Sequence, residues 1–279
     1  MKKIFSIALT VILLAGLVSG CGSASKDNKG QAGDQKKEQQ EVTIKVGATP
    51  VPHAEILEYV KPMLKKQGIN LEIVEFTDFV LPNKALDDGS IDANFFQHVP
   101  YMEEFAKNNG TKFVALAKVH IEPMGIYSAK IKSLDELKDG GTIAIPNDPT
   151  NEGRALLLLQ KNGLIKLKDT DSLTATPIDI KENPKNYKFA ELDAAQLPKT
   201  LQDVDASVIN TNFALQGGLN PLKDALAIED KDTPYANVLA VKEDNKDNKA
   251  LKTLAETLNS PEVKKFIEDK YQGAIVPAF

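Results

Sequence analysis

The sequence predicts an α/β fold with two lobes, each a mainly parallel sheet flanked by helices, and a ligand cleft between the lobes. The chain has 279 residues, of which 42% are hydrophobic, which suits two lobes at about 100 to 200 residues per domain. Strand and helix periodicities alternate along the chain, as in βαβ units. A late strand that returns to the first lobe would make two chain crossings, and so a hinge.

The first half of the chain supplies strands and helices in turn. Residues 42–48, VTIKVGA, have apolar side chains at every second position, which is the period of a strand. Residues 53–68 have apolar side chains at helical spacing, and Pro62 in their middle is a site where a kink is expected. Residues 71–76 and 111–119 are predicted strands, with a helical stretch between them.

The pattern restarts at GTIAIP, residues 141–146, a strand that leads into a helix over residues 147–160. Further strands are predicted at residues 188–193, 204–210 and 235–241. The last of these is the late strand, and two helices follow it, one beginning with Ser260 as N-cap and Pro261 at the first helical position. We therefore expect one lobe to comprise residues 42–124 with 235–279, and the other residues 125–234.

The front of the chain reads as a lipoprotein signal peptide, residues 1–20. Two lysines precede an apolar run, residues 4–18, that is shorter than the ~20 residues of a spanning helix. The run ends in small residues before Cys21, the only cysteine, and this resembles the lipobox of bacterial lipoproteins. The alternative is a cleaved secretory signal with an incidental thiol.

Residues 21–41 are expected to form the lipidated cysteine and a disordered tether, because their side chains are too polar to form a core. We predict a protein anchored through Cys21 at the extracytoplasmic face of the cell membrane. The formal net charge of −5 and the absence of a long basic run argue against nucleic acid as a partner.

The sequence contains no motif that specifies catalysis, a cofactor or a metal. No GxSxG, Walker loop, GxGxxG or HExxH occurs. The three histidines, His53, His98 and His120, share no metal-ligand spacing. We expect a histidine near the cleft to be a hydrogen-bond donor rather than a ligand.

Arg154 is the only arginine, against thirty-three lysines, and lies near the start of the helix predicted at 147–160. Asp148 is a plausible N-cap there, followed by Pro149. Free N–H groups at a helix start attract anions, and a guanidinium can grip a carboxylate with two donors, which lysine cannot. We expect Arg154 to face an anionic ligand. The alternative is a surface arginine paired with Glu152 or another carboxylate.

A second unusual stretch is DANFFQHVPYMEEF, residues 92–105. Only 6% of the chain is aromatic, yet six aromatic residues fall between positions 76 and 105. We expect Phe105 to belong to the core, and others to sit with His98 in loop or helix-start positions after a short strand. There they could form an aromatic slot open to the cleft. From composition alone, core and slot are equally favoured.

The chain resembles the methionine-binding lipoproteins of bacterial ABC importers, the NlpA type. The resemblance rests on FTDFVLPNKAL, DANFFQHVPYM, IPNDPTNEGRALLLLQ, INTNFA and DTPYANV, and it extends over residues 42–279. It implies a type II periplasmic-binding-protein fold that closes on an amino acid. The implied function is to capture methionine, L- or D-, and to deliver it to a permease driven by a cytoplasmic ATPase.

The resemblance also implies roles for individual residues. Phe79, where the family commonly has tyrosine, would line the side-chain pocket with Phe96, His98 and Tyr101. Arg154 would hold the ligand carboxylate. Asn210 and Asn237 would lie near the polar end of the ligand, with Asn212 as the alternative to Asn210.

Two other classes remain open at this point. One is a binder of the same fold for another small amino acid or a peptide. The other is a zinc-binding or hydrolytic lipoprotein that uses the same cleft, although the sequence offers no nucleophile or metal ligand set beside His98.

Overall fold

The structure is a computed structural model, and it describes residues 41–279. The predictions of a signal peptide, of lipidation at Cys21 and of a polar tether fall on residues outside this range. Over residues 41–279, no helix combines the length and the apolar character that crossing a membrane requires.

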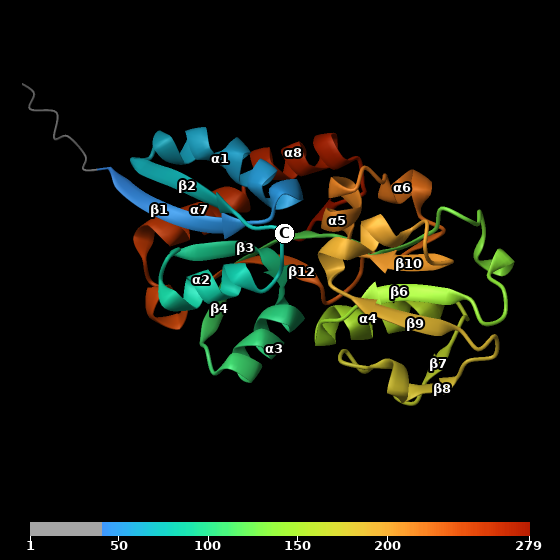
Figure 1. Cartoon of the computed structure of the whole chain (residues 1–279). Coiled ribbons are helices and arrows are strands. Elements are labelled where there is room, and N and C mark those ends of the chain that lie inside the picture. Colours follow the sequence, from blue (N-terminus) through green and yellow to red (C-terminus); the bar gives the residue numbers. More distant parts are fainter. Residues whose placement is uncertain (1–40) are drawn as a thin grey trace, which may run out of the picture. The chain divides into compact units, whose positions relative to one another are not determined.

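Two sheets organise the described chain (Figure 1). The first has six strands in the order β13-β4-β12-β3-β1-β2. Its strands are β1 (Val42–Ala48), β2 (Ile69–Glu75), β3 (Ala93–His98), β4 (Phe113–Ile121), β12 (Ala236–Lys242) and β13 (Val276–Pro277). The second has five strands in the order β11-β5-β10-β6-β9. Its strands are β5 (Gly125–Tyr127), β6 (Thr142–Pro146), β9 (Lys188–Leu192), β10 (Ala206–Ile209) and β11 (Ala227–Ile228). A small antiparallel pair joins β7 (Lys166–Leu167) and β8 (Ile180–Glu182).

Helices connect these strands. The α-helices are α1 (Glu55–Lys65), α2 (Leu81–Asp88), α3 (Val99–Asn109), α4 (Pro149–Lys161), α5 (Thr211–Gln216), α6 (Pro221–Asp224), α7 (Lys249–Leu258) and α8 (Pro261–Tyr271). A π-helical turn, η1 (Pro50–Ala54), precedes α1. The 3-10 turns are η2 (Leu134–Glu136), η3 (Pro177–Asp179), η4 (Ala194–Thr200) and η5 (Glu243–Asn245).

Both sheets are mixed rather than mainly parallel. Strand β1 pairs in parallel with β2 and β3, and β6 pairs in parallel with β9 and β10. Strand β12 is antiparallel to β3 and β4, and β5 is antiparallel to β10 and β11. The parallel half of each sheet consists of the βαβ units that the sequence predicts. The antiparallel half contains the strands that precede or follow the two crossings between the sheets, namely β4, β5, β11 and β12.

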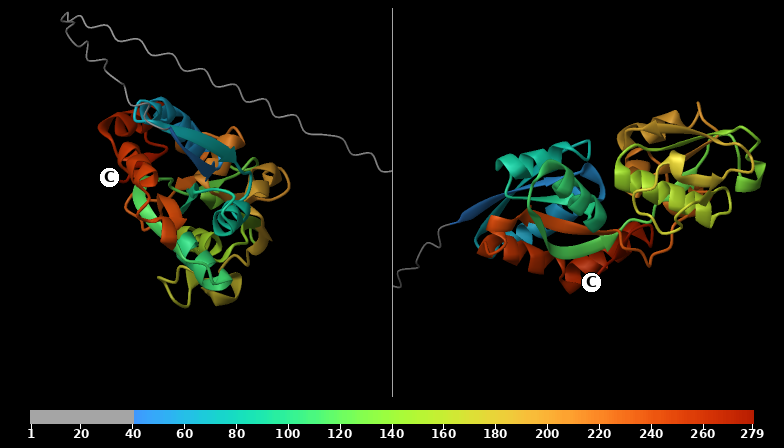
Figure 2. Two further views of the ribbon diagram at one scale, coloured as in Figure 1. Left: turned by 90° about the vertical axis from the view of Figure 1, so that its left-hand side faces the viewer. Right: turned by 90° about the horizontal axis from the view of Figure 1, so that it is seen from below.

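The chain passes between the two sheets twice, after β4 and again after β11. Figure 2 shows from two further sides that β12 and the C-terminal helices, in orange and red, lie with the strands from the start of the described chain, in blue. The return of the predicted late strand to the first sheet is therefore confirmed. The two-lobed α/β architecture follows from these two crossings.

Each sheet buries both faces. In the first sheet, one face packs against α1, α7 and α8, and the other against α2 and α3. Strand β12 serves both cores, since Leu239 and Val241 point to one side, and Val238 and Ala240 to the other. In the second sheet, α4 covers one face, and α5 with η4 covers the other. The ends of the strands facing the other lobe carry the polar residues described next.

Candidate ligand-binding site

One cavity collects all seven residues predicted to bind a ligand. It lies between side chains from both lobes. Its lining comprises Phe79, Phe96, Gln97, His98, Tyr101, Glu122, Asn151, Arg154, Asn210, Thr211, Asn212 and Asn237. Strand β3, the start of α3 and strand β12 contribute from the first lobe, and α4 and the β10–α5 junction contribute from the second.

Three aromatic rings form one wall of the cavity. Phe79 lies 6.0 Å from both Phe96 and Tyr101, measured between ring centroids. The hydroxyl of Tyr101 donates to the backbone oxygen of Phe79 at 2.8 Å, which fixes the loop that carries Phe79. Phe79 also lies 4.8 Å from Phe213 of the other lobe. The wall therefore spans the cleft.

The position of Phe96 follows from the register of β3. The sequence places these aromatics in loop or helix-start positions after a short strand, whereas β3 extends through His98. The pairing with β12 shifts at this point, because Leu239 pairs with Phe95 and Val238 with Gln97, so Phe96 is an extra residue in β3. Phe95 is fully buried in the core of the first sheet, and Phe96 and His98 line the cavity. Phe95 therefore belongs to the core, and Phe96 belongs to the aromatic slot.

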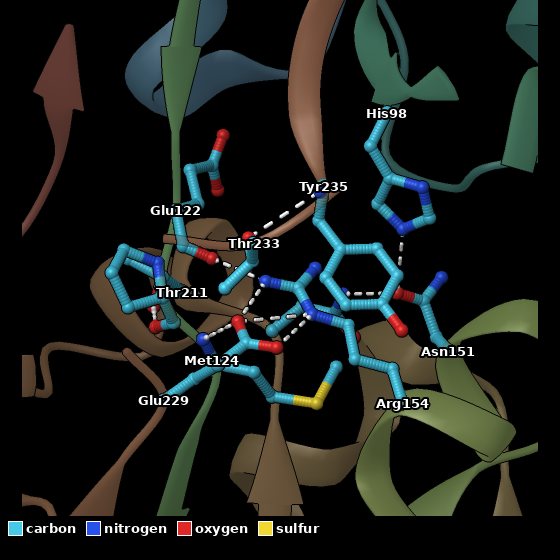
Figure 3. Close-up of polar contacts among 11 residues, drawn as sticks. His98, Glu122, Met124, Asn151, Arg154, Thr211, Glu229, Thr233 and Tyr235 are labelled. Atoms are coloured by element: carbon cyan, nitrogen blue, oxygen red, sulfur yellow. Dashed lines mark hydrogen bonds and ion pairs between the residues drawn. The ribbon is translucent and has the colours of Figure 1, made fainter. Parts of the chain in front are cut away.

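His98 is held as a neutral ring. It is the N-cap of α3, and its Nδ1 accepts from the backbone N–H of Tyr101 at 3.1 Å. Its Nε2 then carries the proton and donates to Oδ1 of Asn151 at 3.2 Å (Figure 3). Burial, and after it the charge of Arg154, lowers the pKa of His98 to about 3. The ring therefore ties the two lobes together as a donor, as the sequence suggests for a histidine near the cleft.

We expect this histidine to make stability depend on pH. Its folded pKa lies below the unfolded value of about 6.5, so its contribution is complete above pH 6.5 and is lost as the pH falls toward 3. Relative to His98→Asn, which keeps a capping side chain, the wild type should lose about 2 kcal/mol of unfolding free energy between pH 7 and 5. Urea unfolding of both proteins at both pH values measures this. Parallel losses in the two proteins would contradict it.

Arg154 lies in the second turn of α4 and is only 3% exposed. Its Nε and Nη2 pair with the carboxylate of Glu229, at 3.1 and 2.5 Å, and Nη2 also donates to the backbone oxygen of Glu122 at 2.7 Å (Figure 3). Its guanidinium carbon lies 4.2 Å from the ring centre of Tyr235. Glu122 belongs to one chain crossing, and Glu229 and Tyr235 to the other, so Arg154 fastens both.

These contacts correct two expectations about Arg154. The two-donor edge of Nε and Nη2 is occupied by Glu229, so it is not free for a ligand carboxylate. The alternative is also corrected in part: Arg154 does pair with another carboxylate, Glu229, but it is buried rather than at the surface. No hydrogen bond within residues 41–279 uses Nη1, and Arg154 is among the residues that line the cavity. Asp148 is the N-cap of α4, as predicted, and its own carboxylate accepts from the N–H of Asn151, which fills the expected anion site.

The amides at the β10–α5 junction face the cavity together. Asn210 donates through Nδ2 to Oδ1 of Asn151 at 2.8 Å. Within the described chain, Oδ1 of Asn210 and Nδ2 of Asn212 are buried without a hydrogen-bond partner. Asn237 accepts from Nε2 of His53 through Oδ1 at 3.1 Å. Asn210 and Asn212 are therefore not exclusive alternatives, because both line the cavity.

Sequence reasoning missed several of the lining residues, above all Glu122 and Asn151. Asn151 lies one turn before Arg154 on the helix that the sequence singles out, so its spacing was a usable signal. Glu122 follows β4 directly and has no such signal. It is 5% exposed, and it meets His53 and His120, which come from η1 and β4. The side-chain nitrogens of both histidines and the carboxylate of Glu122 all lie within 4.8 Å of one another, a grouping that the spacing of the histidines does not reveal.

Comparison with known proteins places this chain in a family. The family model described as NlpA lipoprotein matches residues 44–279. The D-methionine-binding lipoprotein MetQ of Salmonella typhi is 48% identical over 93% of this chain and 92% of its own length. The methionine-binding lipoprotein MetQ of Bacillus subtilis is 43% identical over 99% of each chain.

Solved structures agree with the sequence matches. A nutrient binding protein from Burkholderia cenocepacia, solved bound to methionine, superposes with a TM-score of 0.82 at 50% identity. The match covers 85% of this chain and 100% of that one. At this similarity the two-lobed architecture is shared, and the resemblance stated above is confirmed. The chain belongs to the NlpA lipoprotein family.

Proposed function

We propose that this chain captures methionine outside the cytoplasm and delivers it to the permease of an ABC importer. The observation that carries the proposal is the cavity, which joins an aromatic wall to an arginine and a group of amides between two lobes. Relatives at 43 and 48% identity are named methionine-binding lipoproteins. We infer a binding protein without catalytic activity.

The chemistry of the cavity suits a free amino acid with a thioether side chain. Phe79, Phe96 and Tyr101 would hold the thioether, which gains about 0.3 to 1.5 kcal/mol from each suitable aromatic contact. Nη1 of Arg154 would hold the carboxylate, with His98, Asn210 and Asn237 completing the site. About nine heavy atoms at roughly 1 kcal/mol each allow submicromolar binding.

We further propose that the lobes comprise residues 42–124 with 235–279 and residues 125–234. Closure of the lobes around methionine would present a surface that the permease recognises, because a ligand can favour the closed state only through its stronger contacts there. The energy of transport would come from an ATPase on the cytoplasmic side.

The function is tested with a chain that begins at Val42. Mass spectrometry of the small molecules that co-purify should find methionine, and calorimetry should give submicromolar binding of L- or D-methionine. A panel of other amino acids and short peptides should bind at least about tenfold more weakly. Tighter binding of another amino acid or of a peptide would favour the alternative ligand class and overturn the assignment.

The proposed anchor gives a separate prediction. Cys21→Ser should release the protein into the medium or leave an uncleaved precursor, because the thiol needed for acylation is gone. Methionine binding by the chain that begins at Val42 should equal that of the full chain. Membrane fractionation and intact-mass analysis check both statements. A Cys21→Ser protein that is still processed and membrane-bound would contradict the anchor.

A further inference from the structure

Glu122 is a buried carboxylate on the wall of the cavity, in the segment where the chain first passes between the lobes. Its Oε1 lies 3.1 Å from Nε2 of His53 and 2.7 Å from Nε2 of His120. The contact with His120 is a hydrogen bond, whereas Nε2 of His53 is bonded to Oδ1 of Asn237 and lies beside the same oxygen of Glu122. No side-chain hydrogen bond within residues 41–279 uses Oε2, and the backbone N–H of Asn212 also donates to this carboxylate.

The hydrogen-bonding pattern around the two histidines defines their protons. The hydroxyl of Thr49 lies 2.7 Å from Nδ1 of His53 and can donate to it, which leaves the proton of His53 on Nε2. Burial lowers the pKa of His53 to about 4 and that of His120 to about 3. Both rings are then neutral: His120 donates to Glu122, and His53 donates to Asn237 and lies against Glu122. They orient its carboxylate but do not balance its charge.

Arg154 does not balance that charge either. Its Nε and Nη2 are paired with Glu229, and Nη2 meets Glu122 only at the backbone oxygen. The carboxylate of Glu122 thus has no direct pair with the guanidinium. Burial raises the pKa of Glu122, and the charge of Arg154 offsets this only in part.

A free amino acid would supply the positive charge that the carboxylate of Glu122 lacks. Its carboxylate would meet Nη1 of Arg154, and its ammonium group requires acceptors on the same wall. Oε2 of Glu122 is one acceptor, and Oδ1 of Asn210, buried and unpartnered within the described chain, is a second. We propose that Glu122 binds the ammonium group of the amino acid ligand, with His53 and His120 as positioning residues.

This inference rests on the proposed function and adds a group that selects for a free α-amino acid. The same three residues could instead hold a metal ion, since their ligand atoms lie within 4.8 Å of one another. The geometry favours the ammonium, because the Nε2 atoms are already in use: that of His120 is bonded to Oε1 of Glu122 and that of His53 to Oδ1 of Asn237. Metal binding becomes an outcome of the test.

The experiment compares two ligands with the full-length protein in detergent. L-methionine and 4-(methylsulfanyl)butanoate share the thioether and the carboxylate, and only methionine has the amino group. Wild type should bind methionine at least about 100-fold more tightly, and Glu122→Gln should reduce this ratio at least about 10-fold. Glu152→Gln is the matched control, because Glu152 is also 5% exposed but does not line the cavity; its ratio should equal that of wild type.

Each outcome decides the matter. A wild type that binds no methionine refutes the proposed function itself, and this is measured first. A wild type that binds methionine and 4-(methylsulfanyl)butanoate within threefold of each other refutes the ammonium site even if Glu122→Gln does not fold. An unchanged ratio in folded Glu122→Gln refutes it as well. The outcome could instead be that wild type binds one equivalent of zinc, that methionine competes with this zinc, and that Glu122→Gln does not bind it. That result would identify a metal site.

The positioning role has its own measurement. His120→Phe removes one donor to Glu122, from a ring that does not line the cavity. The ratio of the two affinities should fall in this variant, while the affinity for 4-(methylsulfanyl)butanoate stays within about threefold of wild type. A purely structural histidine would change both affinities together, and that result would overturn the positioning role.

Discussion

Phe96→Ala should weaken methionine binding by about 2 to 4 kcal/mol, or about 30- to 1000-fold, and lower the thermal midpoint only modestly. Phe96 stands on the cavity face of β3, with Phe79 and Tyr101 each 6.0 Å away between ring centroids. Removing its ring takes away a wall that the thioether would contact. The neighbouring rings cannot close the gap easily, because Tyr101 is bonded to the backbone of Phe79. Calorimetry and thermal unfolding measure the two effects separately.

The adjacent residue is the control for this prediction. Phe95 is fully buried and meets the rings of His53 and His120 edge-on, at 4.8 and 5.3 Å. Phe95→Ala should cost about 3 to 5 kcal/mol of stability, while the folded fraction keeps its affinity within about tenfold. If Phe96→Ala loses stability and keeps affinity, Phe96 serves the core and the assignment of the aromatic wall is wrong.

This contrast shows what the sequence could and could not predict. Strand β1 was predictable, because its apolar side chains follow the two-residue period. Strand β6 was predictable as a short apolar run that begins after a glycine and ends at a proline. Strand β3 is buried along its whole length, so its pattern is not alternating. The sequence predicts where β3 begins but not how far it extends. Only the register of β3 against β1 and β12 separates Phe95 from Phe96.

The polar half of the cavity was harder to predict, for a different reason. Arg154 could be singled out because it is the only arginine. Its partner Glu229 is one of many acidic residues, and the two meet only because β11 pairs with β5 beside α4. In the same way, His53, His120 and Glu122 meet because η1 packs beside β4. Contacts between residues far apart in the chain depend on topology, which local patterns do not specify.

Arg154→Lys should weaken methionine binding by about 1.5 to 3 kcal/mol and also destabilise the fold. A lysine has a single ammonium group, so it cannot pair with Glu229, bond the backbone oxygen of Glu122 and still offer a donor to the ligand. Arg154 makes the first two contacts from one planar group, and its Nη1 remains for the proposed contact with the carboxylate. The loss should appear in calorimetry with methionine, and the fall in stability in urea unfolding.

Two comparisons separate the binding role of Arg154 from its role in the fold. Wild type should reject methioninol, which has no carboxylate, whereas Arg154→Lys should discriminate much less between methioninol and methionine. Glu229→Gln keeps the guanidinium but removes the charge that holds it, so stability should fall while the preference for methionine over methioninol remains. If the preference survives in Arg154→Lys as it does in Glu229→Gln, Arg154 only fastens the two crossings, and the carboxylate binds elsewhere. Because Arg154 forms a buried pair with Glu229, Arg154→Lys should lower stability whether or not Arg154 binds the ligand. The preference for methionine over methioninol is therefore the decisive measurement.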